Sequence, residues 1–291
     1  MIGFVILHFN ELNTTLSCIN SISNVCKDYR VAIVDNCSPD GSGKVLSRIF
    51  EDNPKINVIL NDTNLGFAKG NNIGYLYLKK LYNCDYICIS NNDILVNQIN
   101  FERNLESIYL ETAFDICGPQ IVCKNGEISP IRINKPSLER AKKDLNELSI
   151  LYFFSFVQLD IPAIYIINFL KYLLKKNVEN VKKNDGHLEK YGYLNEVVLH
   201  GCFLIFSKKF INKFDGLCPD TFLYHEEELL YLKAKKENAI IIYTRHLNVI
   251  HLEDISTNSI FKSKLTKRRF KYYNEIKSLK ILIKELSVKY E

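Results

Sequence analysis

No two of the nine cysteines are spaced as CxxC, and several of them lie inside apolar runs. Structural zinc sites and thioredoxin-like redox sites normally contain such a pair, so the sequence excludes both classes. Cysteines inside apolar runs also fit poorly with a disulfide framework. We therefore expect reduced thiols, as in a cytoplasmic protein.

Signals for export, repeats and linkers are also missing. The apolar run Ile2–Leu7 follows Met1 directly, with no basic region and no small-residue cleavage site, so we expect no secretory leader. A chain of 291 residues, 47% of them hydrophobic, can bury one large core. The net charge of +5 is mild, and we expect no nucleic-acid partner.

Short apolar runs alternate with segments of helical periodicity. This alternation predicts parallel βαβ units with right-handed crossovers. The predicted strands are 2–9, 30–34, 56–60, 86–90, 202–206 and 240–243, and the predicted helices are 12–26, 43–51, a segment ending at 81, and 226–237.

Four polar stretches stand where apolar runs stop: 35–38, 64–72, 91–93 and 224–228. In an open parallel sheet, ligands bind beyond the carboxyl ends of the strands, so these stretches should converge on one crevice. That pattern is typical of an enzyme.

Asp93 follows Asn91 and Asn92 directly after a predicted strand. Carboxylate and amide oxygens suit Mg²⁺ or Mn²⁺, which often share their shell with substrate phosphates. His251 ends a later strand and could complete that shell. The alternative is that the triplet is only a turn and that His251 is structural.

Asp35 could accept hydrogen bonds from a base or ribose, or it could be a turn or helix-cap aspartate. The glycines and asparagines of 64–74 allow close backbone approach to a ligand at a helix start. They do not have the G-x-G-x-x-G spacing and they follow the third strand, which argues against a hydride-transfer enzyme.

Glu226, Glu227 and Glu228 open a predicted helix, where acidic residues are favoured by the helix dipole. Consecutive helical residues point about 100° apart, so one or two of these side chains can face the crevice. A carboxylate held there could take a proton from an acceptor hydroxyl.

Residues 134–190 interrupt the alternation with an apolar stretch from Leu148 to Leu174. Its length would span a bilayer, but Gln158 and Asp160 would be costly there. A pair of helices hinged at Pro162, buried in the core or lying at a membrane interface, fits better.

The tail, 260–291, shows one apolar stripe among many lysines. The stripe could pack on its own domain, associate with a second copy as a homo-oligomer, or hold the helix against an anionic membrane. It consists of Tyr272, Ile276, Leu279, Ile283, Leu286 and Tyr290.

The order of these motifs closely resembles that of the family 2 glycosyltransferases, and within them the rhamnosyltransferase-type branch of bacterial surface-polysaccharide synthesis. The resemblance covers about 1–125 and 195–259. It rests on Phe9-Asn10, Asp35-Asn36-Cys37-Ser38, Asn64 to Gly74, Asn91-Asn92-Asp93, His200-Gly201-Cys202 and Phe222 to Glu227.

The resemblance implies a GT-A fold: a Rossmann-like, mostly parallel α/β sheet flanked by helices, with a helical insertion and a C-terminal amphipathic helix. It implies a catalytic domain over 1–259, with halves at 1–130 and 195–259 and the insertion at 134–190. It also implies a nucleotide-diphosphate sugar donor, a divalent metal (Mn²⁺ or Mg²⁺) and inversion at the anomeric carbon.

By the same resemblance, Glu227 holds the position of the catalytic base. The family more often has Glu-Asp here, so Glu226 stays an alternative. The metal position falls to Asp93 and His251. The nucleotide-sugar residues would be Phe9, Asn10, Asp35, Asn36, Asn64, Gly66, Lys69, Gly70, Asn71, Asn91 and Asn92.

We expect the acceptor to be a glycan or a polyprenyl-linked glycan of a capsule, O-antigen or cell wall, and the donor to be dTDP-rhamnose or a UDP-sugar. The enzyme would be cytoplasmic, with peripheral contact at the inner face of the membrane. The alternatives are an inactive scaffold of the same fold and a sugar nucleotidyltransferase. The latter would need a basic, Gly-rich phosphate loop where the chain has His8 to Glu11.

Overall fold

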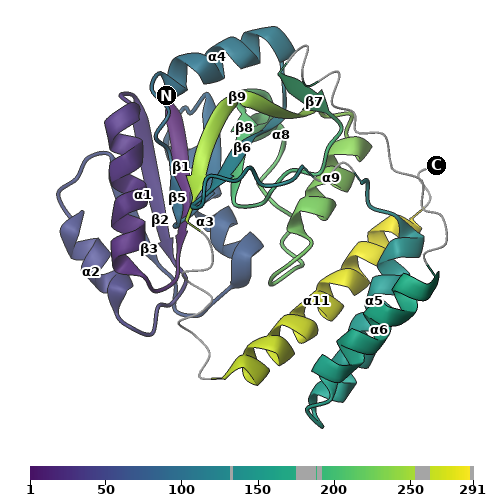
Figure 1. Cartoon of the computed structure of the whole chain (residues 1–291). Helices are drawn as coiled ribbons and strands as arrows, with labels where there is room; N and C mark the ends of the chain where they lie inside the picture. The colour runs from purple at the N-terminus through teal and green to yellow at the C-terminus, as the bar shows by residue number, and fades with distance from the viewer. Residues whose placement is uncertain (132–133, 175–187, 189–191, 253–262, 289–291) are drawn as a thin grey trace.

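The computed structural model describes residues 1–131, 134–174, 188, 192–252 and 263–288. Within these ranges, one mixed sheet with the strand order β3-β2-β1-β4-β8-β6-β9-β5 lies between helices, and β7 pairs with β9 (Figure 1). The strands are β1 Ile2–His8, β2 Tyr29–Asp35, β3 Ile56–Leu60, β4 Tyr86–Asn91, β5 Ile94–Leu95, β6 Ile116–Cys123, β7 Tyr193–Asn195, β8 Phe203–Ser207 and β9 Ile241–His251.

The first half of the sheet is parallel, as the alternation predicts. β1 pairs in parallel with β2 and β4, and β2 pairs in parallel with β3. The helices α1 (Leu12–Val25), α2 (Ser42–Ile49) and α3 (Gly66–Leu81) connect these strands. The carboxyl ends of β1, β2 and β4 therefore lie at one edge of the sheet.

The second half makes the sheet mixed. β8 runs antiparallel to both β4 and β6, whereas β6 and β9 are parallel. β9 continues past the predicted strand 240–243 to His251, with a bulge between Thr244 and Asn248 in its pairing with β6. The remaining helices of this half are α4 (Phe101–Thr112), α8 (Lys208–Lys213) and α9 (Glu226–Lys236).

Both faces of the sheet are covered, which explains why the strands read as continuous apolar runs. Phe4 and Ile6 of β1 share a core with Ile19 of α1 and Phe101 of α4. Val5 points the other way, into a second core that α3, α8, α9 and the C-terminal helix complete. All nine cysteines have free thiols, in line with the expected reduced state.

The insertion and the tail form one group of three helices beside the sheet (Figure 1). These are α5 (Leu138–Ser155), α6 (Asp160–Leu174) and α11 (Lys264–Ser287), and α11 packs along α5. The predicted pair of helices is present, but the hinge at Pro162 is wrong. Residues 156–159 form the turn between the two helices. Pro162 lies in the first turn of α6, where a missing N–H is tolerated.

Asp160 is fully buried and accepts hydrogen bonds from the Nε (2.5 Å) and Nη2 (3.2 Å) of Arg268. The Arg268 guanidinium is the main reason that the pKa of Asp160 is lowered. This pair joins the insertion to the tail and accounts for a charged residue within an apolar run. No helix in the described ranges is long and apolar enough to cross a bilayer.

The apolar stripe of α11 packs on its own domain, which is one of the three roles that the sequence predicts for it. Tyr272 and Leu279 are buried, as is Leu282 one turn further on. Ser278, on the same side, donates a hydrogen bond to the Leu223 carbonyl (2.7 Å). Tyr290 lies outside the described residues.

Candidate active site

A cleft of about 240 Å³ opens at the carboxyl ends of the parallel strands. His8 is paired with Asp35, and Leu7 with Asn91, so the residues after these strands are neighbours. Six residues predicted to bind the nucleotide sugar line this cleft, which we call the donor cleft: Phe9, Asn36, Asn64, Gly66, Asn91 and Asn92.

Five further lining residues were not predicted: Leu7, Phe67, Phe222, Leu223 and Phe270. Phe222 precedes α9, and its ring meets that of Phe270 of α11 edge to face, with centroids 6.3 Å apart. Phe222 belongs to a quoted motif and could have been proposed from it. Phe270 comes from the tail, and no local pattern places it at the sheet edge.

Asn36 shapes the wall of the donor cleft. Its Nδ2 donates to Asn64 Oδ1 (2.9 Å) and to the Gly66 carbonyl (3.1 Å). Its Oδ1 accepts from the Leu65 N–H (3.0 Å) and from Asn61 Nδ2 (3.2 Å). Both donors and both acceptor positions of the amide are thus used to hold the 61–66 loop. Asn36 therefore positions the loop.

Gly66 allows the loop before α9 to approach α3 closely. Its φ is +79°, and a Cβ there would lie 2.3 Å from the Phe222 carbonyl oxygen. That oxygen accepts a hydrogen bond from the Phe67 N–H (2.7 Å), an otherwise unpaired donor of the first turn of α3. Only glycine fits this position without moving Phe222.

Asp35 and Asn10, also predicted to bind the nucleotide sugar, do not line the donor cleft. Asp35 is buried and accepts hydrogen bonds from the Ser38 N–H (3.2 Å) and hydroxyl, which is the geometry of a turn aspartate. The Asn10 N–H donates to the Ser38 hydroxyl (2.8 Å), while its buried Oδ1 has no hydrogen-bond partner. Asn10 also has a left-handed φ of 59°.

Three of the predicted residues on α3 do not line the donor cleft. Lys69 is exposed to solvent. Gly70 packs against β1, since a Cβ there would lie 2.6 Å from a Leu7 methyl group. Asn71 is buried and donates to the Phe67 carbonyl (3.0 Å). Their proposed contact with the donor stays a prediction.

Asp93 and His251 come together although 158 positions separate them in the sequence. His251 is paired with Ile94 across β5 and β9, and its Nε2 lies 3.3 Å from Asp93 Oδ1. Asp93 Oδ1 is buried without a hydrogen-bond partner. An oxygen and an imidazole nitrogen that converge in this way fit Mn²⁺. No larger group of His, Cys, Asp and Glu able to hold a metal occurs in the described ranges, so phosphate and water oxygens would have to complete the shell.

The three glutamates of α9 face different surroundings. Glu226 is buried, and burial, followed by the charge of Glu227, raises its pKa to about 7. Glu227 Oε1 accepts a hydrogen bond from the Gly201 N–H (3.2 Å), next to β8. Glu228 Oε2 lies 3.5 Å from His225 Nδ1. Cys202, the residue after Gly201, accepts a hydrogen bond from the N–H of Asn91 at the end of β4 (2.9 Å). Of the three glutamates, Glu227 is therefore the one directed at the carboxyl end of β4.

Comparison with known proteins identifies the family. No curated protein matches the chain. The crystal structure of S. aureus TarS 1-349 in complex with UDP is similar, with a TM-score of 0.53 and 12% identity over 95% of this chain and 72% of that chain. The complex of the same protein with UDP-GlcNAc gives 0.53 and 13% over 100% and 68%. At these identities the likeness shows a shared GT-A-like fold. Residues 4–214 match the family described as Glycosyl transferase family 2, so the chain belongs to that family and is a glycosyltransferase.

Proposed function

We propose that this enzyme transfers a sugar from a nucleotide diphosphate to a hydroxyl of a glycan or polyprenyl-linked glycan, with inversion at the anomeric carbon. One observation carries the proposal: the donor cleft, the Asp93–His251 pair and Glu227 share one edge of the sheet. Asn91 and Asn92 line the cleft, and Asp93 follows them in the chain. The Asn91 N–H binds the Cys202 carbonyl, and the N–H of the preceding Gly201 binds Glu227.

The donor cleft suits a nucleoside. Phe9, Phe67 and Phe222 supply aromatic surface for a base, and Asn64 and Asn91 supply amides for polar groups. UDP and UDP-GlcNAc, bound in the similar TarS structures, support a uridine nucleotide. A dTDP-rhamnose donor remains the narrower alternative from the sequence. In either case the product would enter a capsule, O-antigen or cell-wall polysaccharide.

Asp93 and His251 are the residues that would hold a divalent cation, Mn²⁺ or Mg²⁺. When bound, the cation would supply positive charge to the diphosphate leaving group. The buried Asp93 oxygen without a hydrogen bond supports this assignment.

We assign the base to Glu227, which would take the proton of the acceptor hydroxyl as the hydroxyl attacks the sugar. Glu226 is buried and is the weaker alternative. Glu227→Gln should lower the transfer rate about a hundredfold to ten-thousandfold, the usual contribution of a general base. Nucleotide binding, measured by calorimetry, should be retained.

The matched control for this experiment is Glu106→Gln, which removes the charge of an exposed glutamate on α4. It should leave the transfer rate unchanged. A Glu227→Gln enzyme that keeps the wild-type rate would remove Glu227 as the base. If Glu226→Gln alone stopped transfer, the role would pass to Glu226.

We also infer a cytoplasmic enzyme that rests on the inner face of a membrane through α5 and α6. Phe153, Tyr165, Ile166, Phe169 and Tyr172 are each at least 60% exposed. The turn between the two helices adds Phe156 and Val157, 58% and 61% exposed. An apolar, aromatic surface of this size is typical of a contact site.

Basic residues favour an anionic membrane as the partner of this surface. Arg268 and Arg269 bind Asp160 and the Ser155 carbonyl, which places the first turns of α11 beside the turn between α5 and α6. Lys264 and Lys267 also lie at the start of α11. In Figure 1 this end of α11 is at the lower end of the three helices. Each lysine near an anionic surface contributes about 1 kcal/mol to binding.

A further inference from the structure

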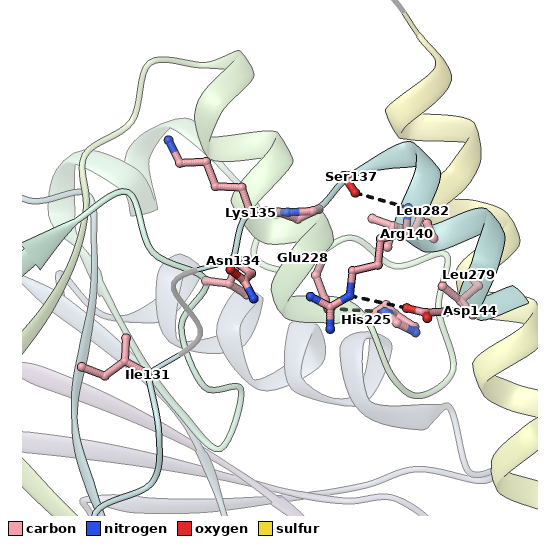
Figure 2. Close-up of a pocket in the computed structure, with 13 residues that line it drawn as sticks. Ile131, Asn134, Lys135, Ser137, Arg140, Asp144, His225, Glu228, Leu279 and Leu282 are labelled. Atoms are coloured by element: carbon pink, nitrogen blue, oxygen red, sulfur yellow. Dashed lines mark hydrogen bonds and ion pairs between the residues drawn. The ribbon is translucent and has the colours of Figure 1, made fainter. Parts of the chain in front are cut away.

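A second pocket of about 550 Å³ lies between the segment leading into α5, the first turn of α9 and the C-terminal half of α11 (Figure 2). Leu279 and Leu282 of α11, with Ile131 and Val198, form its apolar wall. None of its lining residues lines the donor cleft. The insertion and the tail build most of it, and the proposed donor chemistry uses none of its side chains.

The polar side of the pocket alternates basic and acidic groups (Figure 2). Arg140 Nε lies 3.7 Å from Asp144 Oδ2 on α5, and His225 Nδ1 lies 3.5 Å from Glu228 Oε2 on α9. Burial alone would lower the pKa of His225, but the charges of Glu228 and Glu275 outweigh it and raise that pKa. Donors and acceptors therefore face the same space, without a large excess of either charge.

The pocket lies beside the proposed base. Glu227 and Glu228 are adjacent on α9 and point about 100° apart, so one faces Gly201 and the other faces the pocket. Val198 of the pocket wall is three residues before Gly201.

Two consecutive residues before α9 have left-handed backbones, Tyr224 (φ 73°) and His225 (φ 68°). This conformation is costly for residues with side chains and tends to be kept where a functional group must be held in place. Here it presents His225 to the pocket.

We propose that this pocket binds a sugar unit of the acceptor, and that this unit is an uncharged, hydroxyl-rich saccharide. The inference rests on the proposed function, since it supplies the substrate that Glu227 would deprotonate. Sugar hydroxyls can donate to Asp144 and Glu228 and accept from Arg140, while the C–H face of the ring packs on Leu279. A phosphate group fits less well, because Arg140 and His225 each stand beside a carboxylate of the pocket and Lys135 is bound to Glu196 (2.7 Å).

The test is saturation-transfer NMR with a panel of methyl glycosides of neutral hexoses, 6-deoxyhexoses and N-acetylhexosamines. Arg140→Ala and Asp144→Ala should each weaken glycoside binding about tenfold, because each removes a hydrogen-bonding side chain, a loss worth roughly 1.4 kcal/mol. Arg103→Ala, at an exposed arginine of α4, is the matched control and should bind as the wild type does. The Arg140 and Asp144 side chains are 64% and 46% exposed, so both variants should fold, which circular dichroism would verify.

Thermal stabilisation by UDP and dTDP, measured on the same samples, separates this inference from the proposed function. The inference is overturned if no glycoside binds the wild type, or if both variants bind glycosides as the wild type does. A different result is also informative: the wild type binds glycosides, the variants do not, and no nucleotide stabilises the protein. That result would overturn the proposed function and support the sugar site.

Discussion

Three adjacent glutamates at the start of α9 acquire different chemistry from their surroundings alone. Glu226 is buried, Glu227 is directed toward Gly201 at the strand ends, and Glu228 is directed toward His225. The helical twist of about 100° per residue separates them. The sequence alone leaves Glu226 and Glu227 as alternatives, and burial favours Glu227.

Glu226→Gln should stabilise the protein, and more so as the pH rises. Burial and the charge of Glu227 raise the pKa of Glu226 from 4.5 to about 7, so the folded state binds its proton more tightly than the unfolded state. The wild type should therefore lose stability as the pH rises from about 4.5 through 7, by up to roughly 3 kcal/mol. The glutamine variant should lack this loss. Urea unfolding at pH 5 and pH 8 measures both slopes.

Glu106→Gln serves as the control here as well, because an exposed glutamate should change neither slope. If wild type and Glu226→Gln lose the same stability between pH 5 and pH 8, Glu226 is not the buried acid that the structure describes.

At the scale of elements, the loop before α9 is held by two helices, α3 and α11. Asn72 of α3 clamps Leu217, accepting from its N–H (2.8 Å) and donating to its carbonyl (2.9 Å). Ser278 of α11 donates a hydrogen bond to the Leu223 carbonyl (2.7 Å). This loop carries Phe222 into the donor cleft, so both contacts bear on the donor site.

Asn72→Ala should cost roughly 1–3 kcal/mol of stability, because two backbone groups of Leu217 lose their partners. Nucleotide affinity should fall as well, since the loop that places Phe222 is loosened. Urea unfolding and nucleotide calorimetry measure the two effects. Asn20→Ala on the exposed side of α1 is the control. Unchanged stability and affinity in Asn72→Ala would show that the loop is held without this clamp.

The sequence predicts β1 to β4 to within one or two residues, because strands buried on both faces read as apolar runs that end at polar stretches. It does not predict β6, and it ends β9 eight residues too early. It misplaces the break between α5 and α6, since proline is tolerated in a first helical turn. Asp93 and His251, named from the sequence as candidate ligands of one metal, lie 3.3 Å apart, and their binding of a metal stays a prediction. The sequence does not predict Phe270 in the donor cleft. Phe270 is on α11, far along the chain from Gly66 and Phe67, and only tertiary packing brings it to them.

At the scale of the whole molecule, α5 and α6 lie beside the sheet (Figure 1). Their exposed aromatic and aliphatic side chains form an apolar surface. Tyr165→Ser combined with Phe169→Ser should weaken binding to vesicles of anionic lipid at least about tenfold, because two rings leave the interface. Vesicle co-sedimentation at low and high salt measures this.

Leu81→Ser combined with Leu110→Ser is the matched control for the vesicle experiment. These leucines are 62% and 78% exposed but lie on α3 and α4, away from α5 and α6. The control should bind vesicles as the wild type does. A wild-type protein that stays in the supernatant with anionic vesicles at low salt would contradict the membrane contact.

The most direct test of the account is thermal unfolding of the wild type and of Asp93→Asn against a panel of nucleoside diphosphates and their sugars, with and without Mn²⁺. A ligand that binds only the folded state must raise its stability, by about 2.7 kcal/mol at a hundred times the dissociation constant. We predict that one nucleotide stabilises the wild type, that Mn²⁺ increases the shift, and that Asp93→Asn loses the increase. If no nucleotide stabilises the protein with or without the metal, the donor site proposed here is contradicted, and an inactive scaffold becomes the better description.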